Sequence, residues 1–151
     1  MSDLRELYQT TILDHNKKPR NFCKPDGANR EANGWNPLCG DKVTVYLTVD
    51  DDGVVQEIGF QGSGCAISTA SASMMTQVVK GKALKEVLEI FDRFHDLVTN
   101  SPSAGADAEA LGKLAVFSGV REYPMRVKCA TLAWHTLRSA VRGDSEIAKT
   151  E

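Results

Sequence analysis

The stretch from Lys42 to Phe60, KVTVYLTVDDDGVVQEIGF, decides the fold. Its apolar residues alternate with polar ones on both sides of the turn sequence DDDG at residues 50–53. Strict alternation is typical of strands with one buried face, and acidic residues followed by glycine are typical of a tight turn. The pattern predicts two antiparallel strands joined as a hairpin, whose apolar face fixes the register.

The residues before the hairpin predict one helix and an extended connection. Asp3 and Glu6 have capping-box spacing, and apolar residues on one side predict an amphipathic helix from Asp3 to about Asn16. Residues 17–36 contain prolines and glycines with little periodicity, which indicates an extended segment. A short third strand is expected near residues 32–35.

The residues after the hairpin are typical of helices, which are expected over residues 65–80, 84–97, 107–117 and 129–142. The first of these is rich in alanine, serine and threonine, which allow a helix to lie close to its neighbours. Strands followed by helices, without strict alternation of the two, predict an α+β fold. We expect a small antiparallel sheet of about three strands with helices packed on one face.

Length and composition fit one globular domain. The chain has 151 residues, of which 42% are hydrophobic and 25% charged. We expect a single domain over residues 1–143 and a frayed C-terminal tail over residues 144–151.

Charge and hydropathy argue against two classes of partner. The formal net charge is −2, with basic residues scattered among acidic ones, so we expect no nucleic-acid partner. No stretch approaches the roughly 20 apolar residues that span a bilayer, so we expect no membrane partner and a cytoplasmic location. Thiols stay reduced in the cytoplasm, so the four cysteines favour metal binding or reactive-thiol chemistry over disulfides.

Two cysteines lie where a thiol pKa is expected to fall. Cys65 follows Gly-Ser-Gly at the expected start of a helix, and Cys129 is expected to open the last helix after Arg126 and Lys128. Helix N-termini and nearby cations both stabilise the thiolate, which is the form that binds metals or attacks sulfur.

Cys39 and Asp41 lie in a turn-rich loop, NPLCGD at residues 36–41, just before the first clear strand. Three thiolates from Cys39, Cys65 and Cys129 with the Asp41 carboxylate would form a tetrahedral zinc site or hold part of an iron–sulfur cluster. Spacing alone does not separate these two, nor exclude cysteines that are merely small buried hydrophobes. For Cys23 we expect this last, purely structural role.

Three ordered motifs carry a resemblance to a known family. They are NPLCGD at residues 36–41, GSGCAISTASAS at residues 62–73 and RVKCATLAW at residues 126–134. The chain resembles the U-type iron–sulfur cluster assembly family, the IscU, NifU N-terminal and SufU group, from its N-terminal helix to about Arg142. The resemblance implies that Cys39, Cys65 and Cys129 are the functional cysteines and that Asp41 is the accompanying carboxylate.

Two features separate this chain from members that resemble the housekeeping scaffold. Those members carry histidine before the third cysteine and, upstream, a Leu-Pro-Pro-Val-Lys segment that docks a dedicated chaperone. This chain has Lys128 before Cys129, and YPMRV at residues 123–127. An additional helical stretch is also expected between Leu97 and Arg121. These features are similar to the SufU branch.

Resemblance to the SufU branch implies a zinc ion held by Cys39, Asp41, Cys65 and Cys129. It also implies a sulfurtransferase-like role, in which sulfur comes from a SufS-like pyridoxal-phosphate cysteine desulfurase and passes to downstream cluster scaffold proteins. Cys39 is the expected acceptor, because its loop is expected to be the most mobile of the ligand-bearing segments.

Three alternatives remain open from the sequence. The chain could be a scaffold on which Cys39, Cys65 and Cys129 assemble a [2Fe–2S] cluster for transfer to apo-proteins, or a structural zinc domain. A zinc hydrolase is disfavoured, because four protein ligands leave no position for water.

The remaining candidates have smaller expected roles. Arg126 and Lys128 are interpreted as residues that orient a partner or a thiolate, with a solvated surface position as the alternative. Three histidines outside the motifs and two apolar residues of the last helix are interpreted as structural: His15, His95, His135, Trp134 and Leu137.

Overall fold

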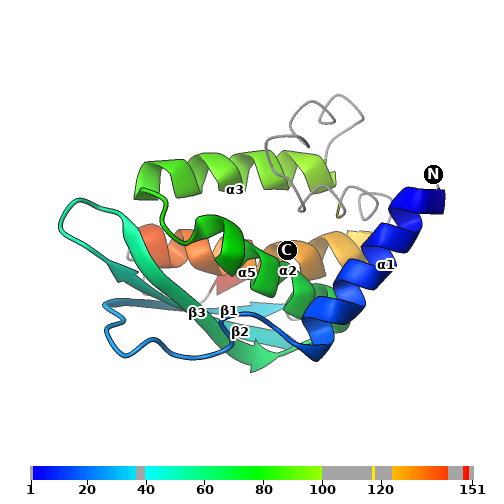
Figure 1. The fold of residues 1–151 in the computed structure, drawn as a ribbon, viewed down its shortest axis with the longest axis horizontal. Coiled ribbons are helices and arrows are strands. Elements are labelled where there is room, and N and C mark those ends of the chain that lie inside the picture. The colour runs from blue at the N-terminus through cyan, green and yellow to red at the C-terminus, as the bar shows by residue number, and fades with distance from the viewer. Residues whose placement is uncertain (1, 37–39, 100–116, 118–123, 143–147, 150–151) are drawn as a thin grey trace.

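Three long antiparallel strands form one layer of this computed structural model, and helices cover one face of the sheet (Figure 1). The structure describes residues 2–36, 40–99, 117, 124–142 and 148–149. Their elements in chain order are α1 (Ser2–Lys17), β1 (Arg30–Asn36), β2 (Asp41–Val49), β3 (Val55–Ser63), α2 (Ala66–Val79), α3 (Leu84–Thr99), α5 (Pro124–Arg142) and β4 (Ala148–Lys149). The predicted α+β class is confirmed.

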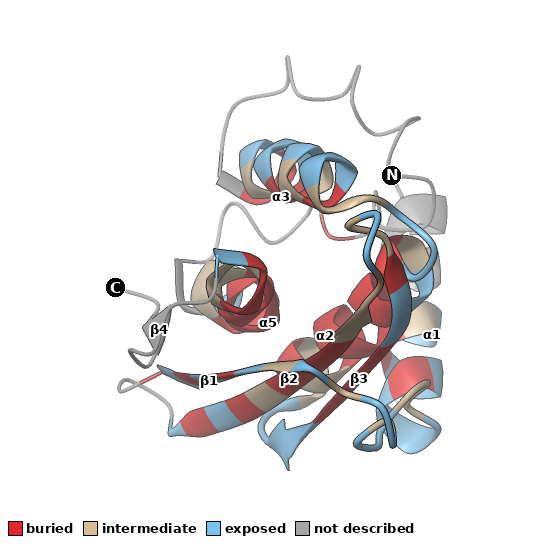
Figure 2. Ribbon diagram, turned by 90° about the vertical axis from the view of Figure 1, so that its left-hand side faces the viewer, coloured by how far each residue is buried: buried red, intermediate tan, exposed pale blue. Residues whose placement is uncertain are grey.

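The register of the sheet follows the predicted apolar face. Strand β2 lies between β1 and β3, and Val45 pairs with Ala32 on one side and Phe60 on the other. All three residues are buried, and helices α2 and α5 pack on the sheet, whose strands alternate between buried and exposed residues in Figure 2. The predicted hairpin is confirmed, with Gly53 donating to the carbonyl of Asp50 in its turn.

The face of the sheet that points away from the helices is less exposed to solvent than the alternation of apolar and polar residues predicts. Tyr46 points to this face but is only 8% exposed. The ammonium group of Lys24 lies 5.5 Å from the centre of the Tyr46 ring. A Cβ on Gly59, which pairs with Tyr46, would overlap the carbonyl of Cys23. The connection between α1 and β1 therefore crosses the outer face and covers part of it.

Helix α2 begins and ends as predicted, but α5 begins earlier than predicted. Cys65 is the N-cap of α2 and Lys80 its C-cap. Helix α5 begins at Pro124 rather than at Cys129. Proline suits the first turn of a helix, because its missing N–H has no helical acceptor there. Cys129 therefore lies in the second turn, and its predicted position at the helix N-terminus is wrong.

Some predictions fall outside the described residues. Of the extra helix expected over residues 107–117, only Phe117 is among the described residues. Phe117 is buried, and the centre of its ring lies 5.8 Å from that of Phe94. Within the predicted tail, residues 148–149 pair in parallel with Gly34 and Trp35 of β1. The domain boundaries remain a prediction. No helix of the described segments has the length and hydropathy needed to cross a membrane.

Helix α5 crosses β1 at Gly34, where the strand has no side chain. A Cβ at Gly34 would overlap the Thr136 hydroxyl and lie 3.3 Å from Cδ1 of Leu132. Trp134 and Leu137 of the same helix are fully buried, as predicted. The glycine therefore sets how closely α5 approaches the sheet, and with it the height of Cys129 above the sheet.

We expect Gly34→Ala to lower the free energy of unfolding by about 2 kcal/mol, because the added methyl overpacks this crossing. Urea denaturation followed by circular dichroism measures the change. Gly27→Ala is the matched control, since its Cβ would only make ordinary contact with Thr48 at 3.8 Å. Adding Thr136→Ala should recover part of the loss, and equal effects at Gly34 and Gly27 would contradict this account.

Candidate metal centre

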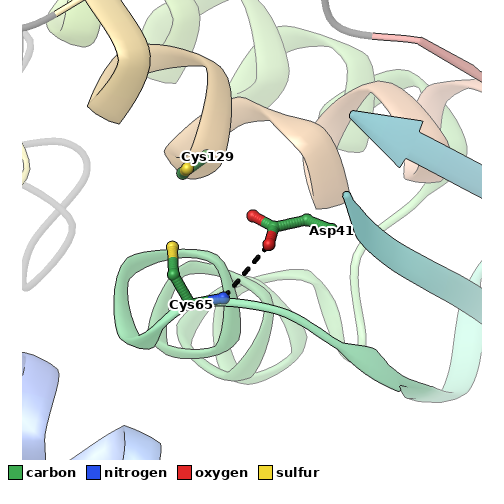
Figure 3. Close-up of side chains that lie close together, drawn as sticks. All are labelled: Asp41, Cys65 and Cys129. Atoms are coloured by element: carbon green, nitrogen blue, oxygen red, sulfur yellow. Dashed lines mark hydrogen bonds between the residues drawn. The ribbon is translucent and has the colours of Figure 1, made fainter. Parts of the chain in front are cut away.

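Three candidate ligands from three separate elements meet at one point (Figure 3). Asp41 is the first residue of β2, Cys65 caps α2, and Cys129 lies on α5. One ligand atom from each residue lies within 4.8 Å of the other two. The fold thus brings together three of the four residues predicted from sequence.

The N-terminus of α2 holds Cys65 in place. The Cys65 sulfur accepts a hydrogen bond from the Ser68 N–H at 3.4 Å, and the Cys65 N–H donates to Oδ1 of Asp41 at 3.2 Å. A Cβ on Gly64 would lie 3.1 Å from both the Asp41 carboxyl and the Ser68 hydroxyl. Glycine therefore lets the chain pass close enough to the carboxylate for this pairing.

The second carboxylate oxygen of Asp41 has no hydrogen-bond partner among the described residues, although it is buried. The whole residue is only 4% exposed. A buried carboxylate oxygen without a partner is unfavourable unless a cation or a proton neutralises it. Asp41 is thus suited to accept a metal ion at the point where the two sulfur atoms converge.

The local environment favours the thiolate form of Cys65. A hydrogen bond with Cys129 and those from the backbone N–H groups of Ser68 and Ile67 lower the pKa of the Cys65 thiol to about 7. The surrounding protein and the negative charge of Asp41 act in the opposite direction. Donors that stabilise the charged sulfur therefore outweigh the repulsion from the neighbouring carboxylate.

The three residues fit a tetrahedral zinc ion with little rearrangement. Zinc–sulfur bonds of about 2.3 Å in a tetrahedron place two sulfur ligands about 3.8 Å apart. The present ligand atoms lie within 4.8 Å, so closing the site needs movements of about 1 Å. Thiolates with one carboxylate also match the borderline-soft character of zinc.

The other predicted residues are distributed as follows. Cys39 lies outside the described residues. Arg126 is exposed and Lys128 half-buried in α5, and their roles stay predictions. Cys23 was expected to be a small buried hydrophobe, but it is exposed. That expectation was wrong because the segment containing Cys23 crosses the solvent side of the sheet rather than its core.

The histidines lie away from the three ligands. His15 is buried, and its Nδ1 is hydrogen-bonded to Ser73 Oγ at 2.7 Å. His95 and His135 both contact the Phe91 ring, between α3 and α5. Burial and the positive charge of Arg138 lower the pKa of His135 to about 4, so this imidazole is neutral at pH 7. These positions agree with the structural interpretation.

Sequence reasoning missed two residues that shape the site. Ser68 donates its backbone N–H to the sulfur of Cys65, and Gly64 leaves room for Asp41. The spacing of Cys65 and Ser68 is that of an N-cap and its N3 residue, which is a signal in the sequence. Cysteine is not among the residues preferred at the N-cap, so this spacing alone did not predict the hydrogen bond from Ser68 to Cys65.

The NifU-like N-terminal domain family matches residues 7–142. The chain belongs to this family. A zinc-dependent sulfurtransferase SufU of Bacillus subtilis (strain 168) is 39% identical over 141 residues, which cover 93% of this chain and 92% of the relative. An iron–sulfur cluster assembly scaffold protein IscU of Streptococcus pyogenes serotype M1 is 37% identical over 142 residues, covering 94% and 87%.

A solved structure supports the same relationship. A candidate iron–sulfur cluster assembly scaffold protein for the SUF system, from Fervidobacterium islandicum AW-1, superposes with a TM-score of 0.77 at 34% identity. The match covers 90% of this chain and 97% of that chain. Family membership, predicted from the three motifs, is confirmed. The relatives are named both as scaffolds and as a zinc-dependent sulfurtransferase, so family membership alone leaves the activity open.

We expect metal-free protein to alkylate at Cys65 with a midpoint near pH 7, because Cys129 and the α2 backbone stabilise the thiolate. Iodoacetamide rates measured by mass spectrometry across pH 5–10 test this in a Cys23→Ser/Cys39→Ser background. Adding Cys129→Ala removes the main stabilising donor and should raise the midpoint toward the ordinary value of 9.0. An identical midpoint with and without Cys129 would exclude the proposed pairing.

Proposed function

We propose that this protein is a zinc-bound sulfur acceptor in iron–sulfur cluster assembly. It would take persulfide sulfur from a SufS-like pyridoxal-phosphate cysteine desulfurase and pass it to downstream cluster scaffold proteins. The observation that carries the proposal is the buried, unpartnered Oδ2 of Asp41 beside two converging cysteines. The similarity to the Bacillus subtilis SufU, at 39% identity, supports zinc and sulfur transfer as the chemistry.

The proposed ligand set is Cys39, Asp41, Cys65 and Cys129. Cys39 is joined to Asp41 through Gly40 alone, and two residues span at most about 7 Å. Bound zinc would keep the ligating thiols deprotonated at neutral pH and so store a nucleophile. Four protein ligands leave no position for a water molecule, which argues against hydrolysis.

The cysteines are not equally free to leave the metal. Cys65 is tied to the first turn of α2 by its cap, and Cys129 is 7% exposed within α5. Cys39 falls in the sequence between the end of β1 at Asn36 and the start of β2 at Asp41, outside the described residues. The other two cysteines are held by α2 and α5, so we propose Cys39 as the acceptor.

The proposed transfer is a thiol–persulfide exchange. The Cys39 thiolate attacks the outer sulfur of the desulfurase persulfide, and a new sulfur–sulfur bond forms at Cys39. The sulfur–sulfur bond on the desulfurase breaks, and its electron pair leaves with the desulfurase cysteine as a thiolate. Cys39 then carries the persulfide, and no external oxidant or reductant is required.

Two cationic residues of α5 have a proposed supporting role. Arg126 is exposed and so could contact a partner protein, whereas Lys128 is half-buried next to Cys129 in the sequence. Protonated lysine has no lone pair for a metal, so Lys128 is not a ligand. We propose that these residues orient a partner group or attract a thiolate.

We expect Cys39→Ala to abolish stimulation of a cognate cysteine desulfurase, because the acceptor thiol is lost. Alanine release and sulfide production by the desulfurase, with and without this protein, measure the effect. Cys23→Ala is the matched control, because Cys23 is exposed on the opposite side of the sheet and should leave stimulation unchanged. Full stimulation by Cys39→Ala would eliminate Cys39 as the acceptor.

We expect protein purified without added metal to contain about one zinc per chain, and Asp41→Ala to lower its zinc affinity at least tenfold. Inductively coupled plasma mass spectrometry and competition with a chromophoric chelator measure these values. Anaerobic reconstitution tests the scaffold alternative, which the name of the Streptococcus relative favours. A stable [2Fe–2S] chromophore with stoichiometric iron and sulfide, together with absent zinc, would replace sulfur transfer by the scaffold function.

A further inference from the structure

A buried hydroxyl group on α2 forms hydrogen bonds with two residues of α5 that lie one helical turn apart. The Ser71 hydroxyl donates to the carbonyl oxygen of Ala130 at 2.5 Å, and its Oγ accepts from Nε1 of Trp134 at 3.1 Å. All three residues are 0% exposed. No water competes for these groups, so breaking either bond leaves a buried polar group poorly satisfied.

These bonds connect the two helices that carry the candidate ligands Cys65 and Cys129. Ser71 belongs to the helix that Cys65 caps, and Ala130 follows Cys129 directly in α5. A helical side-chain atom lies about 5 Å from the helix axis, so a rotation of α5 by about 20° would move the Cys129 sulfur about 1.7 Å. A functional site tolerates about 0.5 Å, so the rotation of α5 must be fixed.

The indole of Trp134 fixes the direction of the hydroxyl. Its ring stacks on Phe94 of α3, with centroids 4.6 Å apart and planes 17° apart. The Trp134 N–H therefore points at Ser71 in a direction set by packing. With one lone pair of Ser71 Oγ engaged by the indole, the hydroxyl proton is left to bond the carbonyl of Ala130.

We infer that Ser71 is a positioning residue that sets the spacing between Cys65 and Cys129 through the rotation of α5 on α2. Its importance for zinc binding rests on the proposed function, but the spacing itself can be measured without a metal. Residues that orient metal ligands without touching the metal commonly contribute about ten- to hundredfold to affinity.

Ser73 supplies a matched comparison on the same helix. It is also 0% exposed and hydrogen-bonded, but its Oγ contacts Nδ1 of His15 and accepts from the Arg20 N–H at 2.8 Å. Both partners precede the sheet, and neither belongs to α5. Removing the Ser73 hydroxyl should therefore weaken the packing of α1 without changing the spacing of the two sulfur atoms.

Phenylarsine oxide provides a probe of that spacing. Its arsenic forms bonds to two thiols, and the two thiol protons leave with the arsenic-bound oxygen as water, without any change in oxidation state. In the chelator-treated Cys23→Ser/Cys39→Ser variant of this 151-residue chain, only Cys65 and Cys129 can form this adduct. The affinity is measured by competition with 2,3-dimercaptopropanol and mass spectrometry, and circular dichroism verifies folding.

We expect Ser71→Ala to weaken phenylarsine oxide binding about tenfold in this background, and Ser73→Ala to change it less than twofold. Trp134→Phe removes the donor that orients Ser71 but keeps the hydroxyl, so it should weaken binding about threefold. Unchanged binding in Ser71→Ala, or equal losses in Ser71→Ala and Ser73→Ala, would overturn the inference. If Ser71→Ala does not fold, Trp134→Phe provides the test. A phenylarsine oxide affinity of Trp134→Phe within 1.5-fold of the Cys23→Ser/Cys39→Ser background would then overturn the inference.

The phenylarsine oxide experiment tests the role of Ser71 independently of the proposed function. The arsenical assay requires neither zinc nor a desulfurase and omits Cys39. A protein that proves to be a cluster scaffold would still show the Ser71 effect, because the two sulfur atoms are the same. Conversely, the protein could bind zinc while Ser71→Ala leaves the affinity for phenylarsine oxide unchanged. That result would support the proposed function and reject the positioning role of Ser71.

Discussion

Buried hydroxyl groups on α2 hold α1 and α5 against it, and the geometry of the site depends on these contacts. Ser71 binds α5, whereas Ser73 and Thr76 bind the end of α1 and the segment after it. Small side chains let the backbones approach closely, and each hydroxyl satisfies a polar group that this approach buries. Large apolar side chains here would hold α5 farther away and separate Cys129 from Cys65.

The same composition explains why α2 depends on its neighbours. A run of alanine, serine and threonine gains little from intrinsic helix propensity, because serine and threonine also bond the backbone in other conformations. In the folded protein, the hydroxyls of Ser71 and Ser73 instead reach partners on other elements. Tertiary hydrogen bonds thus stabilise the helix that carries Cys65, so the candidate metal site depends on the packing of the helical layer.

Much of the fold was predictable because period-two alternation around β2 is a local signal. The start of α5 was not predicted, since Pro124 is compatible with either a loop or a first helical turn. Burial of Tyr46 and exposure of Cys23 also depend on where a connection crosses the sheet, which no periodicity reports. The grouping of Asp41, Cys65 and Cys129 was expected from motifs, but the pairing of Asp41 with the Cys65 N–H required coordinates.

The Asp41 carboxylate and the cysteine thiols of the candidate site have different roles. Oδ1 of Asp41 accepts a hydrogen bond from the backbone N–H of Cys65, whereas Oδ2 has no hydrogen-bond partner among the described residues. This arrangement ties the Asp41 carboxylate to the cap of α2 through Oδ1 and leaves Oδ2 better suited to a cation. An oxygen ligand binds zinc without the covalency of a thiolate, so the ion retains more positive charge to offset the neighbouring sulfur atoms. Under the proposed function, two cysteines anchored on helices beside a fixed carboxylate would retain the metal while Cys39 leaves it, as sulfur transfer requires.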